Sequence, residues 1–395
     1  MKRALAALVG VASVLASTRA LAIDFDAYVW QRVWTDGVRA ALTASRDDFA
    51  RVRVLVAQSG REGRWIEIGA DPRVLAGDPR ARIAVIRCDG AGAPPDVDRF
   101  VGFATTLASR WREAGAPLAG VEIDYDAGAT RLPDYAKRLR EIRSQLPREL
   151  ALSITALPAW LGSPSLDDVL SAVDEAVLQV HAVQAPAHGL FDRALAERWT
   201  RAFAPHAPRG FRIALPAYES RIRFDADGVV VAVENEMPVD LARSSSARDL
   251  RVAPAHVVAL LASLERDPPP HWRGVAWFRL PLAGDRHAWT LAAMRDVMSG
   301  RTPTPRMSMR VAARQGGASD IVIANEGAAG GAAPSFVVEG RECGAADGAN
   351  GWSVERAPKG WRFVADMSHW LAGETETVAG WVRCAAVGAL SFAND

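Results

Sequence analysis

The chain has 395 residues, a formal net charge of +1 and three cysteines, and 49% of its residues are hydrophobic. This length and apolar content suit one large domain with a smaller one, and they exclude a small disulfide scaffold. The near-neutral charge without a basic run predicts no nucleic-acid partner. Because no CxxC, HxH, Walker or EF-hand pattern is present, we also expect no metal site and no cofactor.

The first 22 residues have the pattern of a signal peptide. Lys2 and Arg3 precede an apolar run over residues 4–16, and Ala20-Leu21-Ala22 matches the small-x-small cleavage pattern. The alternative is a membrane anchor, but the run is shorter than the roughly 20 residues that span a bilayer. We therefore expect cleavage before Ile23, export to the periplasm or the medium, and no integral membrane segment afterwards.

Short β-branched or aromatic runs alternate with stretches of helical periodicity, which predicts parallel strands joined by helices. The expected strands are residues 27–34, 53–58, 83–88, 120–125, 151–155, 176–181, 211–215 and 274–278. The clearest helices are residues 97–114, 132–145 and 166–173. Eight such units predict an α/β fold, a (β/α)8 TIM barrel over residues 23–302. A doubly wound sheet would need a glycine-rich turn after the first strand, where residues 31–34 are bulky.

Two further features interrupt or follow the barrel pattern. Residues 220–234 have the pattern of a β-hairpin inserted after the seventh strand. Residues 303–395 alternate without helical segments and predict a small C-terminal β-rich, sandwich-like domain. The tryptophans of this domain can form its core or a sugar-stacking platform, and core packing is favoured; they are Trp352, Trp361, Trp370 and Trp381.

The cysteines allow one disulfide bond in an oxidising compartment. Cys343 and Cys384 both lie in the C-terminal region, whereas Cys88 lies in an expected barrel strand. We expect Cys343 to pair with Cys384. The alternative is that all three are buried thiols.

The segment from Gly120 to Asp126 is the most informative for chemistry. Glu122, Asp124 and Asp126 alternate with apolar residues, so the three carboxylates share one strand face, and Asp126 lies nearest the C-terminal rim. Like charges in a partly desolvated site raise one another's pKa, so one of the acids should hold a proton near neutral pH. A protonated carboxyl group suits general-acid cleavage of a glycosidic bond. A solvated edge strand is the alternative.

This segment resembles the fourth strand of the family 18 glycoside hydrolases, the chitinase-like TIM barrels, which reads DGxDxDxE. Ala119-Gly120 stands for the leading Asp-Gly, Glu122 and Asp124 for the two aspartates, and Asp126 for the glutamate. The resemblance implies a carbohydrate ligand, Asp126 as the acid, Asp124 tuning it and Glu122 beneath them. It also implies that Trp277 forms the floor of the sugar site.

The sequence departs from the family pattern at two places. Asp126 is one methylene shorter than the family's acid, which shortens its reach by about 1.5 Å and on that scale can cost about a hundredfold in rate. Gln179 and His181 stand where the family has a Tyr-Asp pair that positions an acetamido group. These departures put substrate-assisted cleavage of N-acetyl sugars in doubt.

A second carboxylate could complete a two-acid mechanism. Glu219, just after the seventh strand, is the candidate, and the alternative is an ion pair between Glu219 and Arg221, Arg223 or Arg279. The remaining candidates for substrate binding are Trp277, Tyr218, His181, Gln179, Trp34 and Asp89. For His181, a satisfied buried histidine is the favoured alternative.

The sequence thus predicts an exported glycoside hydrolase-like protein that acts on a polysaccharide or glycan. The alternative from another class is a catalytically inactive barrel that binds glycans or cell-envelope partners in the same cleft. A third possibility is that the C-terminal region mediates protein contacts.

Overall fold

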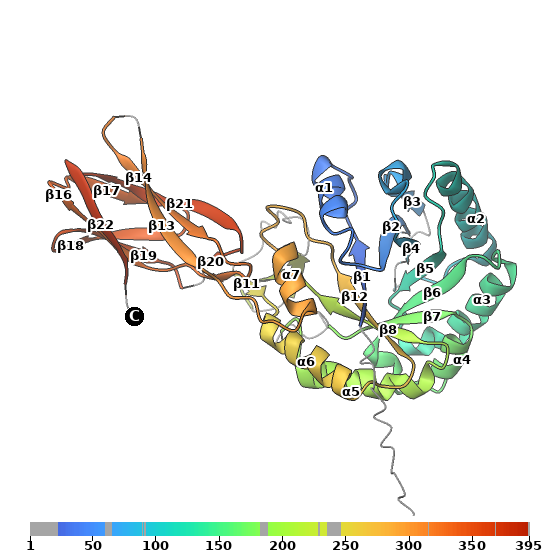
Figure 1. Ribbon diagram of the computed structural model, residues 1–395. Coiled ribbons are helices and arrows are strands. Elements are labelled where there is room, and N and C mark those ends of the chain that lie inside the picture. Colours follow the sequence, from blue (N-terminus) through green and yellow to red (C-terminus); the bar gives the residue numbers. More distant parts are fainter. Residues whose placement is uncertain are drawn as a thin grey trace, which may run out of the picture.

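The computed structural model describes residues 23–393 except residues 60–64, 89, 91, 182–188, 228–229, 235–245, 315 and 368. Two regions lie side by side, a barrel of strands and helices and a body made of strands alone (Figure 1). The expected signal peptide over residues 1–22 lies outside the described residues. Among the residues that the structure describes, no helix has both the length and the apolar character needed to cross a membrane.

Eight parallel strands close into the predicted barrel, which confirms the fold class. In order around the barrel they are β1 (Asp24–Val29), β2 (Arg51–Ser59), β4 (Ala81–Cys88), β5 (Gly120–Tyr125), β6 (Ala151–Ala156), β7 (Glu175–Gln179), β8 (Phe211–Pro216) and β12 (Trp272–Phe278). Pairing of Ala27 in β1 with both Val52 in β2 and Trp277 in β12 closes the barrel. The short strand β3 (Trp65–Glu67) adds antiparallel to β2.

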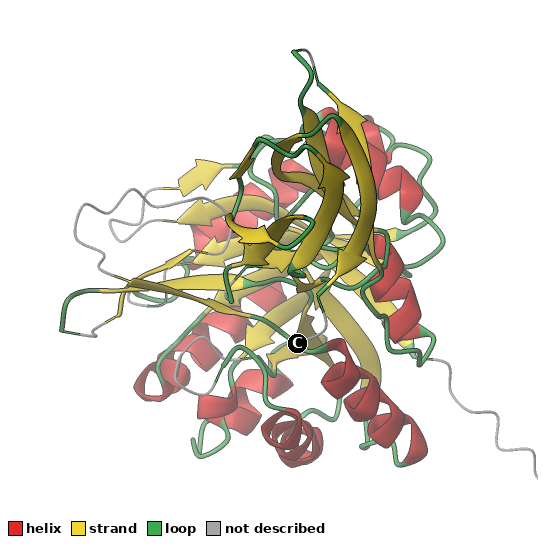
Figure 2. Cartoon of the chain, turned by 90° about the vertical axis from the view of Figure 1, so that its left-hand side faces the viewer, coloured by secondary structure: helices red, strands yellow, loops and turns green. Residues whose placement is uncertain are grey.

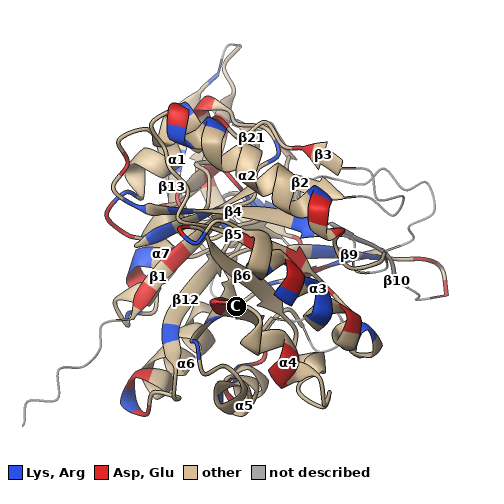
Figure 3. Cartoon of the chain, turned by 90° about the vertical axis from the view of Figure 1, so that its right-hand side faces the viewer, with Lys and Arg blue, Asp and Glu red and all other residues tan. Residues whose placement is uncertain are grey.

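Helices surround the barrel (Figure 2). The α-helices are α1 (Asp36–Ala44), α2 (Val97–Glu113), α3 (Leu132–Gln145), α4 (Leu166–Ser171), α5 (Arg193–Phe203), α6 (Pro254–Arg266) and α7 (Leu291–Met298). The 3-10 helices are η1 (Pro72–Leu75), η2 (Ala129–Arg131), η3 (Pro158–Trp160) and η5 (Ala204–His206). Side-chain caps fix several starts, because Asp96, Asp192 and Thr290 accept hydrogen bonds from backbone N–H groups of α2, α5 and α7. Acidic and basic residues are interspersed on the outer helices (Figure 3).

The first strand is displaced from its predicted range of residues 27–34. It ends at Val29, and Gln31 donates a side-chain hydrogen bond to the carbonyl of Leu280 instead of continuing the ladder. The cause is that residues 31–34 begin the loop to α1 at the barrel rim. The β5 range agrees with the sequence prediction at both ends.

The barrel interior, away from the C-terminal ends of the strands, contains an ion-pair network in addition to apolar side chains. Arg53 of β2 is fully buried and pairs with Asp26 at 2.9 Å, with Glu175 at 2.5 Å and with Glu122. Arg212 contributes further contacts to Asp26 at 3.4 Å and to Glu175 at 3.3 Å. Because buried charges are tolerated only when they are paired, this network ties β1, β2, β5, β7 and β8 together.

The insert after β8 has three described strands. β9 (Ser220–Phe224) pairs antiparallel with β10 (Val230–Glu234), as the predicted hairpin requires, and with β11 (Ser246–Leu250) on its other side. The sequence pattern of residues 246–250 does not predict β11. Arg221 of β9 bonds Asp249 of β11 at 2.7 Å, a charged cross-strand contact without a hydrophobic pattern.

The C-terminal body is a β-sandwich-like pair of antiparallel sheets, as predicted. One sheet contains β13 (Met307–Ala313), β14 (Ser319–Asn325), β21 (Thr375–Arg383) and β17 (Ala345–Gly348); the other contains β18 (Trp352–Ala357), β19 (Gly360–Ala365), β16 (Phe336–Arg341) and β22 (Ala386–Phe392). The small pair β15 (Gly331–Ala332) and β20 (Trp370–Leu371) lies beside them. Their shared core includes Ile321, Ile323, Phe336 and Phe363.

A disulfide bond joins Cys343 and Cys384, the pair favoured by the sequence, between the ends of β16 and β21. Cys88 is a free, buried thiol in β4. Burial raises the pKa of the Cys88 thiol to about 12, so it is protonated at neutral pH.

Candidate active site

Strand register places polar side chains together at the C-terminal end of β5. Glu122 pairs with Ser153 of β6, and Asp124 pairs with Arg87 of β4. Thr155 lies two residues beyond Ser153 and therefore lies beside Asp124 on the same inner face. The alternation predicted for the acids is realised, with Asp126 one step beyond the strand.

Asp124 is held from both neighbouring strands. Arg87 donates a hydrogen bond to Asp124 Oδ2 at 2.8 Å, and the Thr155 hydroxyl donates one to Oδ1 at 2.8 Å. The Asp124 side chain is 3% exposed. Both carboxylate oxygens are satisfied, so this carboxylate has one fixed orientation beneath Asp126.

Asp126 is the acid that solvent reaches, with 38% of its side chain exposed. Its Oδ2 lies 3.5 Å from Arg87, whereas its buried Oδ1 has no hydrogen-bond partner among the described residues. Burial and the Asp124 carboxylate raise the pKa of Asp126 to about 6, against the lowering effect of Arg87 and the nearby Gln179 amide. The side chain can therefore donate a proton near neutral pH.

Glycine keeps a neighbouring loop close to this acid. A Cβ atom on Gly90 would lie 2.3 Å from the backbone oxygen of Asp126. Only a glycine lets the segment after β4 pass the Asp126 backbone at this distance.

Glu122 lies in the buried ion-pair network, beneath Asp124 and Asp126 on the same strand face. It is fully buried, accepts hydrogen bonds from Tyr28 at 2.6 Å and Ser153 at 3.0 Å, and pairs with Arg53. These three contacts hold the Glu122 carboxylate, which lies four residues before Asp126 along the chain. Glu122 therefore affects Asp126 by holding β5 in place.

The predicted floor residue Trp277 lies on the opposite face of its strand. It is fully buried and packs on Phe25 and Trp289, on the side of β12 that faces the helices. The neighbouring Phe278 points into the barrel instead, 5.7 Å from Tyr28 and 4.9 Å from Trp30 between ring centroids. Two adjacent aromatics occupy opposite faces, and the inner one is Phe278.

Two predicted binding residues join this inner aromatic cluster. The His181 ring stacks on Phe278 at 6.2 Å, and its Nδ1 lies 3.2 Å from the carbonyl of Ala214. Tyr218 is 2% exposed and packs edge-on against His181 and Phe278. Burial lowers the pKa of His181 to about 4, so the ring is neutral at neutral pH. His181 is partly buried, with one ring nitrogen beside a backbone carbonyl.

The structure does not bring Glu219 to Asp126, because Glu219 lies beside Arg251 and lines a cavity that does not include Asp126. Arg251 donates a hydrogen bond to Glu219 at 3.1 Å. Glu219 lines a cavity with Trp370 of the C-terminal body. The expected ion pair exists, but its partner is Arg251. Burial raises the pKa of Glu219 to about 7, opposed by Arg251.

The other predicted residues stand as follows. Trp34 is partly buried against the core between strands and helices, and its indole N–H has no hydrogen-bond partner among the described residues. Asp89 lies outside the described residues. No group of three metal-ligating side chains occurs in the part of the chain that the structure describes.

Three residues of the site have no role predicted from the sequence. Arg87 bridges Asp124 and Asp126, Thr155 fixes Asp124, and Phe278 lines the interior. The signal for Arg87 and Thr155 was their place at the ends of strands adjacent to β5. No signal distinguished Phe278 from Trp277.

The barrel fold is shared with solved structures of low sequence identity. The spore cortex-lytic enzyme SleL of Bacillus cereus matches with a TM-score of 0.53 and 11% identity, over 71% of this chain and 74% of that chain. Chitinase ChiA74 from Bacillus thuringiensis matches at 0.47 and 8%, over 94% and 100% of the two chains. A chitinase from Chromobacterium violaceum matches at 0.45 and 15%, over 71% and 99%. The likeness to SleL shows the fold alone. No inference is based on the two chitinases, whose TM-scores are lower.

Sequence comparisons cover both regions. A search of curated proteins found no match. A family described as "Domain of unknown function (DUF8456)" matches residues 308–385 within the C-terminal body. A second one, "Domain of unknown function (DUF3142)", matches residues 78–283, which contain Asp124, Asp126 and six of the eight barrel strands. Because this match covers more than half of the sequence, the chain belongs to the DUF3142 family.

Proposed function

We propose that this protein is a glycoside hydrolase-like enzyme that cleaves an O-glycosidic bond of a polysaccharide or glycan at the barrel mouth. The observation that carries the proposal is Asp126, a partly exposed carboxyl group at the C-terminal end of β5 with its pKa raised to about 6. Active sites of this fold lie at that end of the barrel. The SleL-like fold agrees with this reading by analogy.

In the proposed reaction, protonated Asp126 donates its proton to the glycosidic oxygen as the bond to the anomeric carbon breaks. Water supplies the hydroxyl group to that carbon, and its remaining proton returns to the Asp126 carboxylate. Asp124 raises the proton affinity of Asp126 and is kept in place by Arg87 and Thr155. The partly buried Phe278, which packs on the buried Trp30, supplies apolar surface for a sugar ring face.

The first test is hydrolysis by residues 23–395 across labelled oligosaccharides with and without N-acetyl groups. We expect cleavage of at least one substrate class, and Asp126→Asn should lower kcat by about 10²–10⁴-fold because it removes a general acid. Glu219→Gln is the matched control, since Glu219 faces the other cavity. Cleavage of equal rate in wild type and Asp126→Asn would contradict the assignment.

A non-catalytic glycan-binding barrel is the second candidate. Two observations favour it. The Asp126 side chain is short, and Glu219 does not lie beside it. The carboxylate that does lie beside Asp126 is Asp124, which already accepts two hydrogen bonds. Binding of an oligosaccharide without cleavage, unchanged by Asp126→Asn, would support this candidate over the enzyme.

Export is part of the proposal. Its support is the signal-peptide pattern of residues 1–22 and the disulfide bond between Cys343 and Cys384, which suits an oxidising compartment. Expression of the full chain in a bacterial host, followed by N-terminal sequencing, should give protein beginning near Ile23 outside the cytoplasm. Uncleaved protein in the cytoplasm would contradict export.

A further inference from the structure

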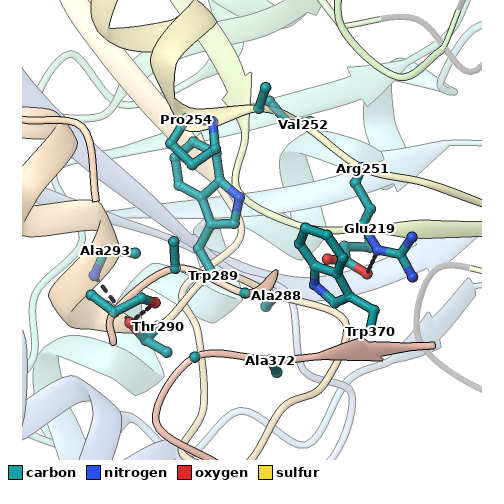
Figure 4. A pocket seen from close by; sticks show the side chains of 15 residues that line it. Glu219, Arg251, Val252, Pro254, Ala288, Trp289, Thr290, Ala293, Trp370 and Ala372 are labelled. Carbon is teal, nitrogen blue, oxygen red and sulfur yellow. Dashed lines mark hydrogen bonds and ion pairs between the residues drawn. The ribbon is translucent and has the colours of Figure 1, made fainter. Parts of the chain in front are cut away.

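A cavity lies between the barrel's insert sheet and the C-terminal body. Its volume is about 960 Å³, within the roughly 300–1,000 Å³ of small-molecule sites. One wall contains β9, β11 and the loop after β12. The other contains Ala332, Gly351, Asp366, Met367, His369 and Trp370. An adjoining pocket of about 320 Å³ shares Glu219, Arg251 and Trp370 with it (Figure 4).

Arginines are concentrated on this surface. Arg221 and Arg251 are paired with Asp249, and Arg251 also bonds Glu219. Arg248 and Arg286 are exposed and line the same cavity, and neither forms a hydrogen bond or ion pair within the described part of the chain. Two guanidinium groups are therefore available to an incoming anion.

Aromatic and apolar surface adjoins these charges. Trp370 is 36% exposed, the most accessible of the four C-terminal tryptophans, and Arg251 lies 4.7 Å from its ring centroid. Trp289 lines the adjoining pocket, and the side chain of Met367 is fully exposed at the cavity wall. Figure 4 shows the Trp370 indole beside the Glu219–Arg251 pair.

The same cavity also contains carboxylates that bear on the kind of ligand. Glu219, Asp249 and Asp366 line it among the arginines. Carboxylates accept hydrogen bonds from hydroxyl groups but repel a densely charged polyanion. This combination suits a ligand with hydroxyl groups, an apolar ring face and one carboxylate per unit, and it disfavours a polyphosphate chain.

We propose that this cavity is a second carbohydrate site, which binds a uronic-acid unit of an anionic polysaccharide. Arg248 and Arg286 bind the sugar carboxylate, and the exposed Trp370 ring packs on the sugar. The site is separate from the barrel mouth, since none of its lining residues contacts Asp124 or Asp126 in the described structure. Binding here does not depend on cleavage at Asp126.

The test is calorimetric titration of residues 23–395 with a galacturonate oligosaccharide and with a galactose oligosaccharide of equal length. The two probes differ in the carboxylate. We expect galacturonate to bind more tightly, and added salt to weaken it. Arg248→Gln and Arg286→Gln should each weaken it up to about fivefold, the ceiling for an exposed ion pair. Both arginines are exposed, so neither change should prevent folding.

Two control variants locate the site. Arg362→Gln changes an exposed arginine of β19 outside this cavity and should leave galacturonate affinity unchanged. Asp126→Asn should also leave it unchanged. Three outcomes would each overturn the proposal. They are equal affinity for both probes, no binding of galacturonate, and binding that is lost in Asp126→Asn but kept in the two cavity variants. The last outcome would move the anionic sugar to the barrel mouth without affecting the proposed hydrolase.

Discussion

Asp126 and Glu219 are both carboxyl groups whose pKa burial raises, yet their surroundings give them different chemistry. Asp126 is next to a second carboxylate and opens to solvent. Glu219 is bonded to an arginine and is 12% exposed. A raised pKa alone therefore does not identify a catalytic acid; the place of the group on the barrel decides.

The shift at Glu219 makes stability depend on pH. Its folded pKa of about 7 exceeds the usual 4.5, so the group favours folding fully below pH 4.5, and that contribution is lost as pH rises to about 7. The shift corresponds to roughly 3 kcal/mol. Wild type should lose this contribution between pH 4 and pH 8, whereas Glu219→Gln should not. The free energy of unfolding of the variant minus that of wild type should therefore rise by roughly 3 kcal/mol between the two pH values.

Denaturant unfolding at both pH values measures this change. Comparing the two pH values removes the constant cost of losing the Arg251 contact. The exposed Glu376→Gln variant is the control. A wild-type-minus-variant difference that stays the same at both pH values would show that Glu219 is not held in its protonated form by burial.

At the scale of elements, the barrel was predictable because its strands are short apolar runs at regular spacing. Strand β5 agrees at both ends, and the polar residues beside it follow from register. The orientation of β12 was not predictable, because Trp277 and Phe278 are adjacent aromatics and period two fits either face. Strand β11 was missed because its stabilising contact, Arg221 with Asp249, is a charge pair.

Arg53 tests the buried network that holds these elements. Arg53→Met should lower the free energy of unfolding by about 3–5 kcal/mol, because it leaves buried carboxylates without a partner. The control Arg112→Met removes a 62% exposed side chain at 3.8 Å from Glu149 and should change stability by less than about 1 kcal/mol. Equal effects of the two changes in a urea titration would contradict the role of the network.

At the scale of the whole molecule, the two-region organisation followed from the change of pattern after residue 303. The cavity between the regions could not be predicted, since it depends on how the insert sheet meets Asp366, Met367, His369 and Trp370. Trp370 looked equivalent to three other tryptophans in the sequence. Only the docked arrangement distinguishes it by exposure.

The most direct measurement of the central claim is the pH dependence of kcat/KM for hydrolysis by wild type and Asp126→Asn. A general acid must be protonated, so wild-type kcat/KM should be highest below the Asp126 pKa of about 6 and fall about tenfold per pH unit above it. The variant should lose this fall together with most of the activity. A wild-type profile that is flat across pH 6, or a variant that keeps the same profile, would contradict Asp126 as the acid.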